Sequence, residues 1–291
     1  MSGGRNLRAN PFSGRGDTES VEAITRADLL SFRDRWLRPD NATIFAAGDS
    51  TLAEIKPLLE SAFGDWKAPA TAKGTKSVVA ATPASPRVVI IDRPGSPQTM
   101  ILAGHLAPPT GVENNLAIEA MNDGVGGQFT ARINMNLRED KGWAYGAYTF
   151  LPDAREARPF MVYAPVQTDQ TAPSIAELRR ELKEYLGKKP LTNEEFDRVM
   201  KNLVRSLPGQ FQTRGSVMGA MLENARFGRP DDYVATLTER YRALSKSDAL
   251  EAAQQVIRPD ELIWLLVGDR AKIEPAVRAL NLGPIETLDV K

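Results

Sequence analysis

The sequence predicts an α+β fold, because its strand-like and helix-like segments occur in runs rather than in strict alternation. Short apolar stretches typical of strands gather near residues 87–106 and 143–166, and amphipathic stretches typical of helices dominate residues 172–257. Apolar residues make up 42% of the chain and charged residues 25%, as is usual for a globular protein with a sizeable core. A doubly wound parallel sheet is therefore disfavoured.

The elements of the carboxy-terminal two thirds follow from local patterns. Apolar runs predict strands at 87–92, 98–106, 143–150, 158–166 and 262–267. Helical periodicity predicts helices at 113–122, 129–139, 172–186, 196–207, 214–226, 231–243 and 247–257, and the glycines predict a loop at 124–127. Thr192, followed three residues later by Glu195, forms a capping box that places the start of the helix over 196–207.

Composition excludes several kinds of site. Acidic and basic residues balance at 37 each, so net charge does not direct the chain toward nucleic acid or an anionic membrane. The chain has no Cys, which excludes disulfides, thiolate nucleophiles and cysteine-based zinc sites. The single histidine is His105, so this chain cannot supply two or three His ligands to a catalytic zinc ion. We expect His105 to be structural, at the end of an apolar strand.

Neither a membrane span nor a signal peptide is expected. No apolar run approaches the roughly 20 residues that a transmembrane helix requires. Residues 1–16 contain Gly and charged residues but no apolar core of the kind that a signal peptide has, so they are predicted to form a loop. The sequence does not fix the compartment.

Residues 25–49 and 245–269 form an internal repeat at an offset of 220 residues, with identical residues at seven positions. In each copy, Ser or Thr followed by Asp three residues later begins a helix, and Arg-Pro-Asp ends it. An apolar run predicts a buried strand at 42–47 or 262–267, and Gly-Asp leads to the next helix. In the first copy, the cap Thr51 with Glu54 begins that helix, which ends near Gly64.

A repeated helix–strand–helix unit suggests two similar domains that each end in this unit. We therefore expect residues 1–66 to be the tail of a preceding domain and 87–291 to be nearly all of a second one. The stretch 67–86 is rich in Ala, Pro, Thr and Lys and is predicted to be the linker. The strand at 42–47 would lack its own sheet, so we expect it to need a partner.

Residues 124–148 hold the densest group of candidate functional residues. Its glycines fit no phosphate-binding motif. They are expected to allow the backbone conformations that a loop leading into a helix requires. Arg138 and Tyr145 lie seven residues apart, and a helix–turn–strand could bring both side chains to one edge. There a guanidinium could grip a carbonyl or carboxylate and a phenol could donate to an oxyanion. The residues alone equally allow a structural role for both.

GGQFTARINMNLREDKGWAYGAY, at residues 126–148, resembles the signature of the carboxy-terminal half of insulinase-type (pitrilysin-like, inverzincin) zinc peptidases, which include mitochondrial processing peptidase. The repeated unit also resembles the ending of each domain of that family, and the resemblance covers residues 21–285. It implies a LuxS- or processing-peptidase-like α+β domain, with a mostly antiparallel sheet covered by helices, preceded by the helix–strand–helix tail of a homologous domain.

The resemblance implies two halves that close around a peptide. The zinc-bearing half carries H-x-x-E-H, and the other half contributes an Arg and a Tyr that match Arg138 and Tyr145, the expected substrate-binding residues. Gly126, Gly127 and Phe129 also match the motif and are expected to be structural.

The chain departs from the family pattern in having no H-x-x-E-H motif. We therefore expect no catalytic residue, metal ligand or cofactor on this chain, and zinc in a missing or partner half. The predicted function is the substrate-binding half of a zinc metalloendopeptidase that is inactive alone, with the zinc half and a peptide as partners.

Two alternatives stay open: a non-catalytic scaffold or peptide-binding subunit of the same fold, and a hydrolase that acts alone through carboxylates or His105. Family members occur in the bacterial periplasm, the cytosol and organelles, so the resemblance leaves the compartment open.

Overall fold

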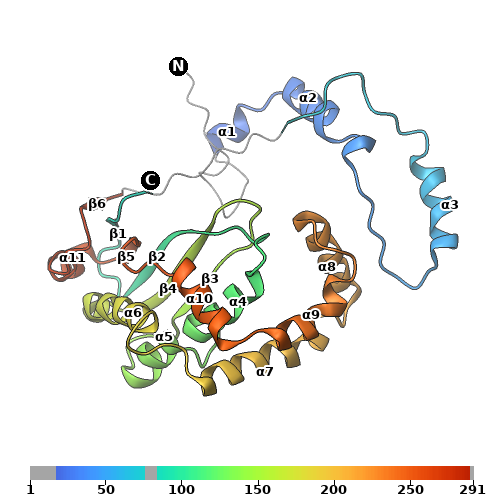
Figure 1. Ribbon diagram of the computed structural model, residues 1–291. Helices are drawn as coiled ribbons and strands as arrows, with labels where there is room; N and C mark the ends of the chain where they lie inside the picture. The colour runs from blue at the N-terminus through green and yellow to red at the C-terminus, as the bar shows by residue number, and fades with distance from the viewer. Residues whose placement is uncertain (1–17, 76–83, 289–291) are drawn as a thin grey trace. The chain divides into compact units, whose positions relative to one another are not determined.

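The computed structural model describes residues 18–75 and 84–288, which belong to two compact units, Met1–Val78 and Val79–Lys291 (Figure 1). The predicted amino-terminal loop, residues 1–16, lies outside the described residues, as does part of the predicted linker. Each unit is described by itself. None of the helices in the described ranges is both long and apolar enough to cross a membrane.

The second unit is built on a six-stranded sheet with the order β3-β4-β2-β5-β1-β6. Its strands are β1 Val88–Asp92, β2 Gln98–Ala107, β3 Tyr148–Phe150, β4 Arg158–Gln167, β5 Ile263–Gly268 and β6 Ile285–Thr287. The pairs β2–β4, β2–β5 and β3–β4 are antiparallel, and β1 pairs in parallel with β5 and β6. The predicted α+β class and mostly antiparallel sheet are confirmed.

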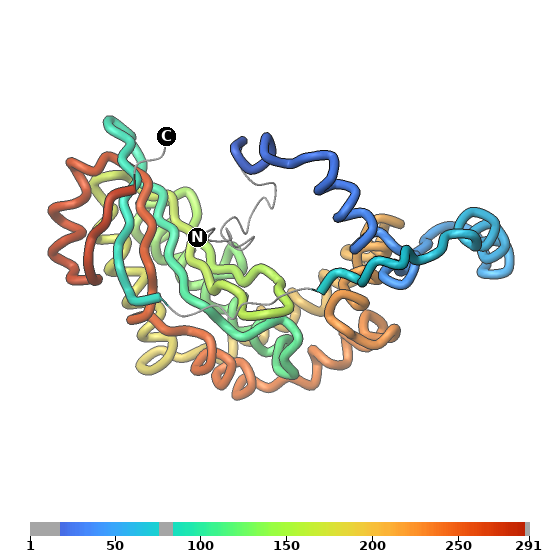
Figure 2. Tube along the Cα trace, turned by 90° about the horizontal axis from the view of Figure 1, so that it is seen from above, coloured from blue at the N-terminus to red at the C-terminus, as the bar shows by residue number. Residues whose placement is uncertain are grey.

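Helices gather on one face of this sheet, as Figures 1 and 2 show for α4, α6 and α10. The burial of the longest strands alternates: in β4, Phe160, Val162 and Ala164 are fully buried and the residues between them are half-buried. This period of two is expected for a sheet that is more deeply covered on one face. The helices of this unit are α4 Asn115–Asn122, α5 Arg132–Asn134, α6 Thr171–Tyr185, α7 Asn193–Gln210, α8 Arg214–Phe227, α9 Tyr233–Ala243, α10 Lys246–Val256 and α11 Arg270–Arg278.

The region of the signature departs from three predicted elements. The predicted loop 124–127 is part of a π-helical turn, η3 Asp123–Gly127, which continues α4. The predicted helix 129–139 begins only with α5 and continues as a second π-helical segment, η4 Met135–Asp140.

The predicted strand 143–150 is shortened to β3, with one isolated bridge between Ala144 and Val166. The backbone N–H groups of Trp143 and Ala144 donate to the carbonyl of Leu137 and so close the helix end instead of extending the strand.

The helices α7 and α9 pack on each other beside the sheet and form a smaller core of their own. Leu116 of α4 joins Leu207, Leu237 and Tyr241 in this core. The Tyr241 hydroxyl donates to the buried Glu119 carboxylate at 2.6 Å, which ties α9 to α4. Burial raises the pKa of Glu119 above its ordinary value.

The first unit contains α1 Thr18–Glu22, α2 Arg26–Trp36, the short 3-10 helix η2 Pro39–Asn41 and α3 Leu52–Phe63. The predicted capping boxes Thr25–Asp28 and Thr51–Glu54 are both present. The predicted buried strand at 42–47 is wrong for this chain, because the segment is neither paired nor buried. A strand requires a neighbour for its backbone N–H and C=O groups, and residues 18–75 offer none in this unit.

Candidate functional site

Arg138 and Tyr145 lie side by side at the end of η4. The guanidinium carbon of Arg138 is 5.3 Å from the centre of the Tyr145 ring and 4.3 Å from the centre of the Phe129 ring. Both distances are within the range of cation–π attraction. The two predicted site residues are therefore brought together. Phe129, in the short segment before α5, contacts the same guanidinium.

The polar ends of this cluster are accessible. The Tyr145 side chain is 84% exposed and Phe129 is 51% exposed, which is unusual for large aromatic residues. The Nε of Arg138 pairs with Glu139 at 3.1 Å. Within residues 18–75 and 84–288, neither terminal nitrogen of Arg138 nor the Tyr145 hydroxyl makes a hydrogen bond. The site thus combines the terminal N–H groups of Arg138, whose side chain is 29% exposed, with the O–H group of the exposed Tyr145.

Asn134 and Asn136 fix the backbone that carries the cluster. The Asn134 amide donates to the Phe129 carbonyl at 2.6 Å and accepts from the Ala147 N–H at 2.9 Å, so it joins both flanks of the cluster. The Asn136 amide donates to Glu177 and Glu181 of α6 at 2.8 and 2.9 Å. Hydrogen bonds first from Arg180 and then from Asn136 hold the pKa of Glu177 below its ordinary value. The cluster is therefore held on a rigid frame.

The glycines of the signature serve packing, as expected. A Cβ on Gly126 would lie 2.5 Å from the Thr149 hydroxyl, and one on Gly127 would lie 2.5 Å from the Asp123 carboxylate. Gly142 has a φ of 66°, which turns the chain between Arg138 and Tyr145. Gly126 and Gly127 thus permit close approaches of backbone to side chain, whereas Gly142 supplies a backbone turn.

His105 is a structural residue in this fold. Its ring stacks on Phe160 at 5.2 Å, and its Nε2 accepts the backbone N–H of Arg258 at 3.1 Å. Burial lowers its pKa, so the ring is neutral at pH 7 and suits that acceptor role. A Ser-His-Asp arrangement around His105 has no support.

No group of three or more His, Cys, Asp or Glu side chains in the described parts of the chain is arranged to hold a metal ion. The sequence predicted Arg138 and Tyr145 as substrate-binding residues and Phe129 as structural, and the structure places the Phe129 ring against Arg138.

Comparison with known protein families shows which family the chain belongs to. A family model described as the peptidase M16 inactive domain matches residues 23–203. The chain belongs to this family. The predicted resemblance to the carboxy-terminal half of an insulinase-type zinc peptidase is thereby confirmed, and the chain corresponds to the non-catalytic half of such proteins.

The chain spans about half the length of the curated relatives that it matches. An uncharacterized zinc protease of Mycobacterium tuberculosis is 27% identical over 185 residues, which cover 62% of this chain and 41% of that protein. An uncharacterized zinc protease of Streptomyces coelicolor is 24% identical over 262 residues, or 87% of this chain and 55% of that protein.

Solved structures share the fold. The peptidase M16 inactive domain from Pseudomonas fluorescens superimposes with a TM-score of 0.78 at 19% identity, covering 88% of this chain and 60% of that one. The first half of the periplasmic protease PqqL from Escherichia coli gives a TM-score of 0.69 at 17% identity, covering 90% of this chain and 60% of that one.

Proposed function

We propose that this chain is the substrate-binding, zinc-free half of a zinc metalloendopeptidase that cleaves peptides or unfolded proteins. The observation that carries the proposal is the convergence of the half-buried Arg138 with the exposed Tyr145: the terminal guanidinium nitrogens and the phenol hydroxyl make no hydrogen bond to the described residues, and only the Nε of Arg138 is paired, with Glu139. The exposed Tyr145 ring is also unusual, because large aromatic side chains are more often buried in the core. The family to which the chain belongs supports a peptidase context.

Each of the two side chains has a distinct part in this proposal. The planar guanidinium of Arg138 can donate two parallel N–H groups to a peptide carbonyl or carboxylate. The Tyr145 hydroxyl can donate to the oxygen on which negative charge develops during attack on the scissile bond. Phe129 also contacts the guanidinium, 4.3 Å from its ring centre, and this second contact would limit the reorganisation of the donors.

The zinc ion belongs to the other half in this proposal, where it would activate water for attack on the peptide bond. This chain supplies binding and orientation, and it is expected to be inactive alone. In the same proposal, residues 1–66 are the tail of the preceding homologous domain, 67–86 the linker and 87–291 the carboxy-terminal domain. The partner is then a zinc-bearing half, either in the same longer chain or as a separate subunit.

The proposal is tested by combining the chain with the zinc-bearing half and measuring cleavage of a quenched fluorescent peptide. Arg138→Ala and Tyr145→Phe should each lower kcat/KM by about 10²–10³-fold, the usual cost of removing one donor to a developing oxyanion. Arg240→Ala is the matched control, because it also removes a guanidinium from over a tyrosine ring, that of Tyr233, at 4.6 Å on α9. It should leave kcat/KM unchanged.

Circular dichroism would establish that all three variants fold. Wild-type turnover by both site variants would contradict the assignment of Arg138 and Tyr145. Peptide binding with no cleavage in any combination of halves would instead favour the alternative function, a scaffold or peptide-binding subunit.

A further inference from the structure

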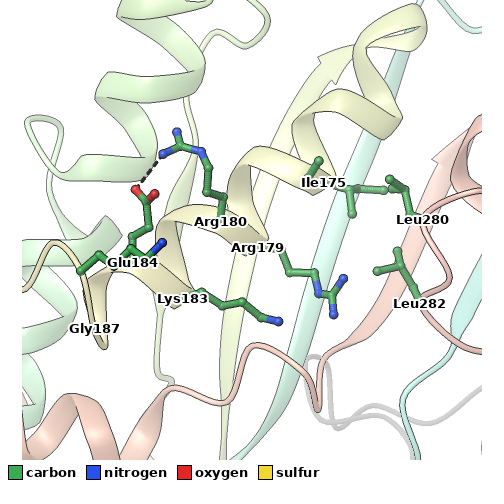
Figure 3. Close-up of a pocket in the computed structure, with 10 residues that line it drawn as sticks. Ile175, Arg179, Arg180, Lys183, Glu184, Gly187, Leu280 and Leu282 are labelled. Carbon is green, nitrogen blue, oxygen red and sulfur yellow. Dashed lines mark hydrogen bonds and ion pairs between the residues drawn. The ribbon is translucent and has the colours of Figure 1, made fainter.

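A groove lies on the second unit between α6 and the loop that follows α11, away from the Arg138 cluster in sequence and not used by the proposed function (Figure 3). Its volume is about 480 Å³, within the usual range for sites that bind small organic molecules. One wall is a stripe along α6, in which Ile175, Arg179, Lys183 and Gly187 recur at every fourth residue. Leu280 and Leu282 form the opposite wall.

The floor of the groove is apolar and preformed. The accessible apolar side chains are those of the exposed Ala176 and the half-buried Leu280, beside the buried Ile175 and Leu282. The loop that presents the two leucines is fixed by two residues with positive φ, Asn281 at 52° and Gly283 at 112°. A Cβ on Gly283 would lie 2.5 Å from the Pro86 carbonyl, so this loop is packed closely against the start of the unit. The backbone of the loop that carries Leu280 is therefore fixed before any ligand binds.

Two cations on the rim converge on one point. Arg179 and Lys183 approach the same carboxylate oxygen of Asp260, at 2.6 and 2.8 Å. Figure 3 shows both side chains extending from α6 across the groove. The Asp260 side chain is 63% exposed, so it is held by these cations rather than by burial. Their hydrogen bonds, first from Lys183 and then from Arg179, lower its pKa.

The remaining charges leave the groove positive. Glu184 is engaged by Arg180 and Lys189, each at 2.8 Å, so its charge is matched. Lys188, also on the groove, makes no ion pair or hydrogen bond with any described residue. Asp260 thus balances one of the three cations Arg179, Lys183 and Lys188.

We propose that this groove binds a carboxylate that ends an apolar chain. The carboxylate would take the place of Asp260 between Arg179 and Lys183, and the apolar chain would lie on Ala176 and Leu280. The Asp260 carboxylate already occupies the geometry that the ligand would adopt, as a built-in competitor. A free aliphatic acid and the carboxy terminus of a peptide with apolar last residues share this chemistry.

The test is calorimetric titration of the whole chain with two probes, sodium decanoate and an acetylated tripeptide that ends in two leucines. Decanol and the amidated tripeptide are the uncharged counterparts. Binding of a carboxylate probe, with loss of binding for its counterpart, supports the proposal. Binding of decanoate alone would identify a free aliphatic acid as the source, and binding of the tripeptide would identify a peptide terminus. Failure of both carboxylate probes to bind would overturn the proposal.

Three variants connect binding to the groove. The double variant Arg179→Ala/Lys183→Ala should weaken binding at least about tenfold, because it removes two charge-assisted hydrogen bonds. Asp260→Asn should tighten binding several-fold, because it removes the competitor. Lys201→Ala, on the exposed face of α7, is the matched control and should bind as the wild type does. Unchanged binding in the double variant, or weaker binding in Asp260→Asn, would overturn the proposal.

Because these titrations use the chain without a zinc-bearing half, their failure would leave the proposed peptidase role untouched. Loss of the peptidase role would equally leave the groove intact. A gain of affinity in Asp260→Asn cannot come from a loss of folding, so it keeps the test decisive if the double variant is unstable.

Discussion

The two copies of the helix–strand–helix repeat have the same sequence pattern and opposite burial. In the second copy, Ala252 and Trp264 are 0% and 1% exposed. Their counterparts 220 residues earlier, Phe32 and Ile44, are 56% and 50% exposed. The second copy packs α10 and α11 on the sheet and inserts β5 between β1 and β2, whereas the first copy has no strand at 42–47.

This difference separates structure that depends on neighbouring residues in the sequence from structure that depends on tertiary contacts. Both copies form a capping box at the start of their first helix, Thr25–Asp28 and Ser245–Asp248, because the cap needs only residues three apart. Only the second copy forms a strand, because a strand needs neighbours. The first copy therefore has the apolar residues for a sheet without the sheet, in agreement with the proposal that a homologous half completes it.

The largest expected difference between the copies concerns their apolar strand residues. Trp264→Ala should lower the free energy of unfolding of the second unit by about 3–5 kcal/mol, as for other large residues removed from a core. Ile44→Ala should change it by less than about 0.5 kcal/mol, because the side chain is exposed. Urea denaturation followed by far-UV circular dichroism measures the free energy of unfolding of both variants without relying on tryptophan fluorescence. Equal losses in the two variants would show that the first copy is buried after all.

A smaller difference is expected at the helix caps. Ser245→Ala should lower the free energy of unfolding of the second unit by about 1 kcal/mol, the usual value of an N-cap side chain. Thr25→Ala removes the same hydrogen bond from Asp28 N–H, at 3.2 Å, but should leave that free energy unchanged. Its effect should be confined to faster amide exchange in α2. A shift of the main unfolding transition in Thr25→Ala would mean that the two units unfold together.

The smallest effect is a pH dependence at the second cap. Hydrogen bonds from the backbone N–H and hydroxyl of Ser245 hold the pKa of Asp248 below its ordinary value of 3.8. Since the folded state has the lower pKa, this cap stabilises the fold above about pH 4, and the stabilisation is lost as the pH falls through the folded-state pKa. In Asp248→Asn, the melting temperature should fall slightly less steeply between pH 5 and pH 3. A parallel course for variant and wild type would contradict this assignment.

Sequence patterns predicted the regular elements well where the signal is local. The capping box at Thr192 and Glu195 and the strands predicted at 98–106 and 158–166, which are β2 and β4, appear in the structure as expected. The approach of Arg138 to Tyr145 was also predictable, because a turn seven residues long leaves few other arrangements.

Features that depend on distant packing were not predictable. The π-helical turns η3 and η4 have wider turns than the α-helix, and they contact Thr149 and α6, which no local sequence pattern brings into view. The groove between α6 and Leu282 joins residues about one hundred positions apart, which no local pattern reveals.

The central claim is that this chain binds substrate and relies on zinc held elsewhere. The most direct test measures zinc content and peptide cleavage of the purified chain, alone and mixed with the zinc-bearing half. The account predicts no stoichiometric zinc in the chain alone and cleavage only in the mixture. Stoichiometric, tightly bound zinc in the isolated chain, or chelator-sensitive cleavage by it, would contradict the account.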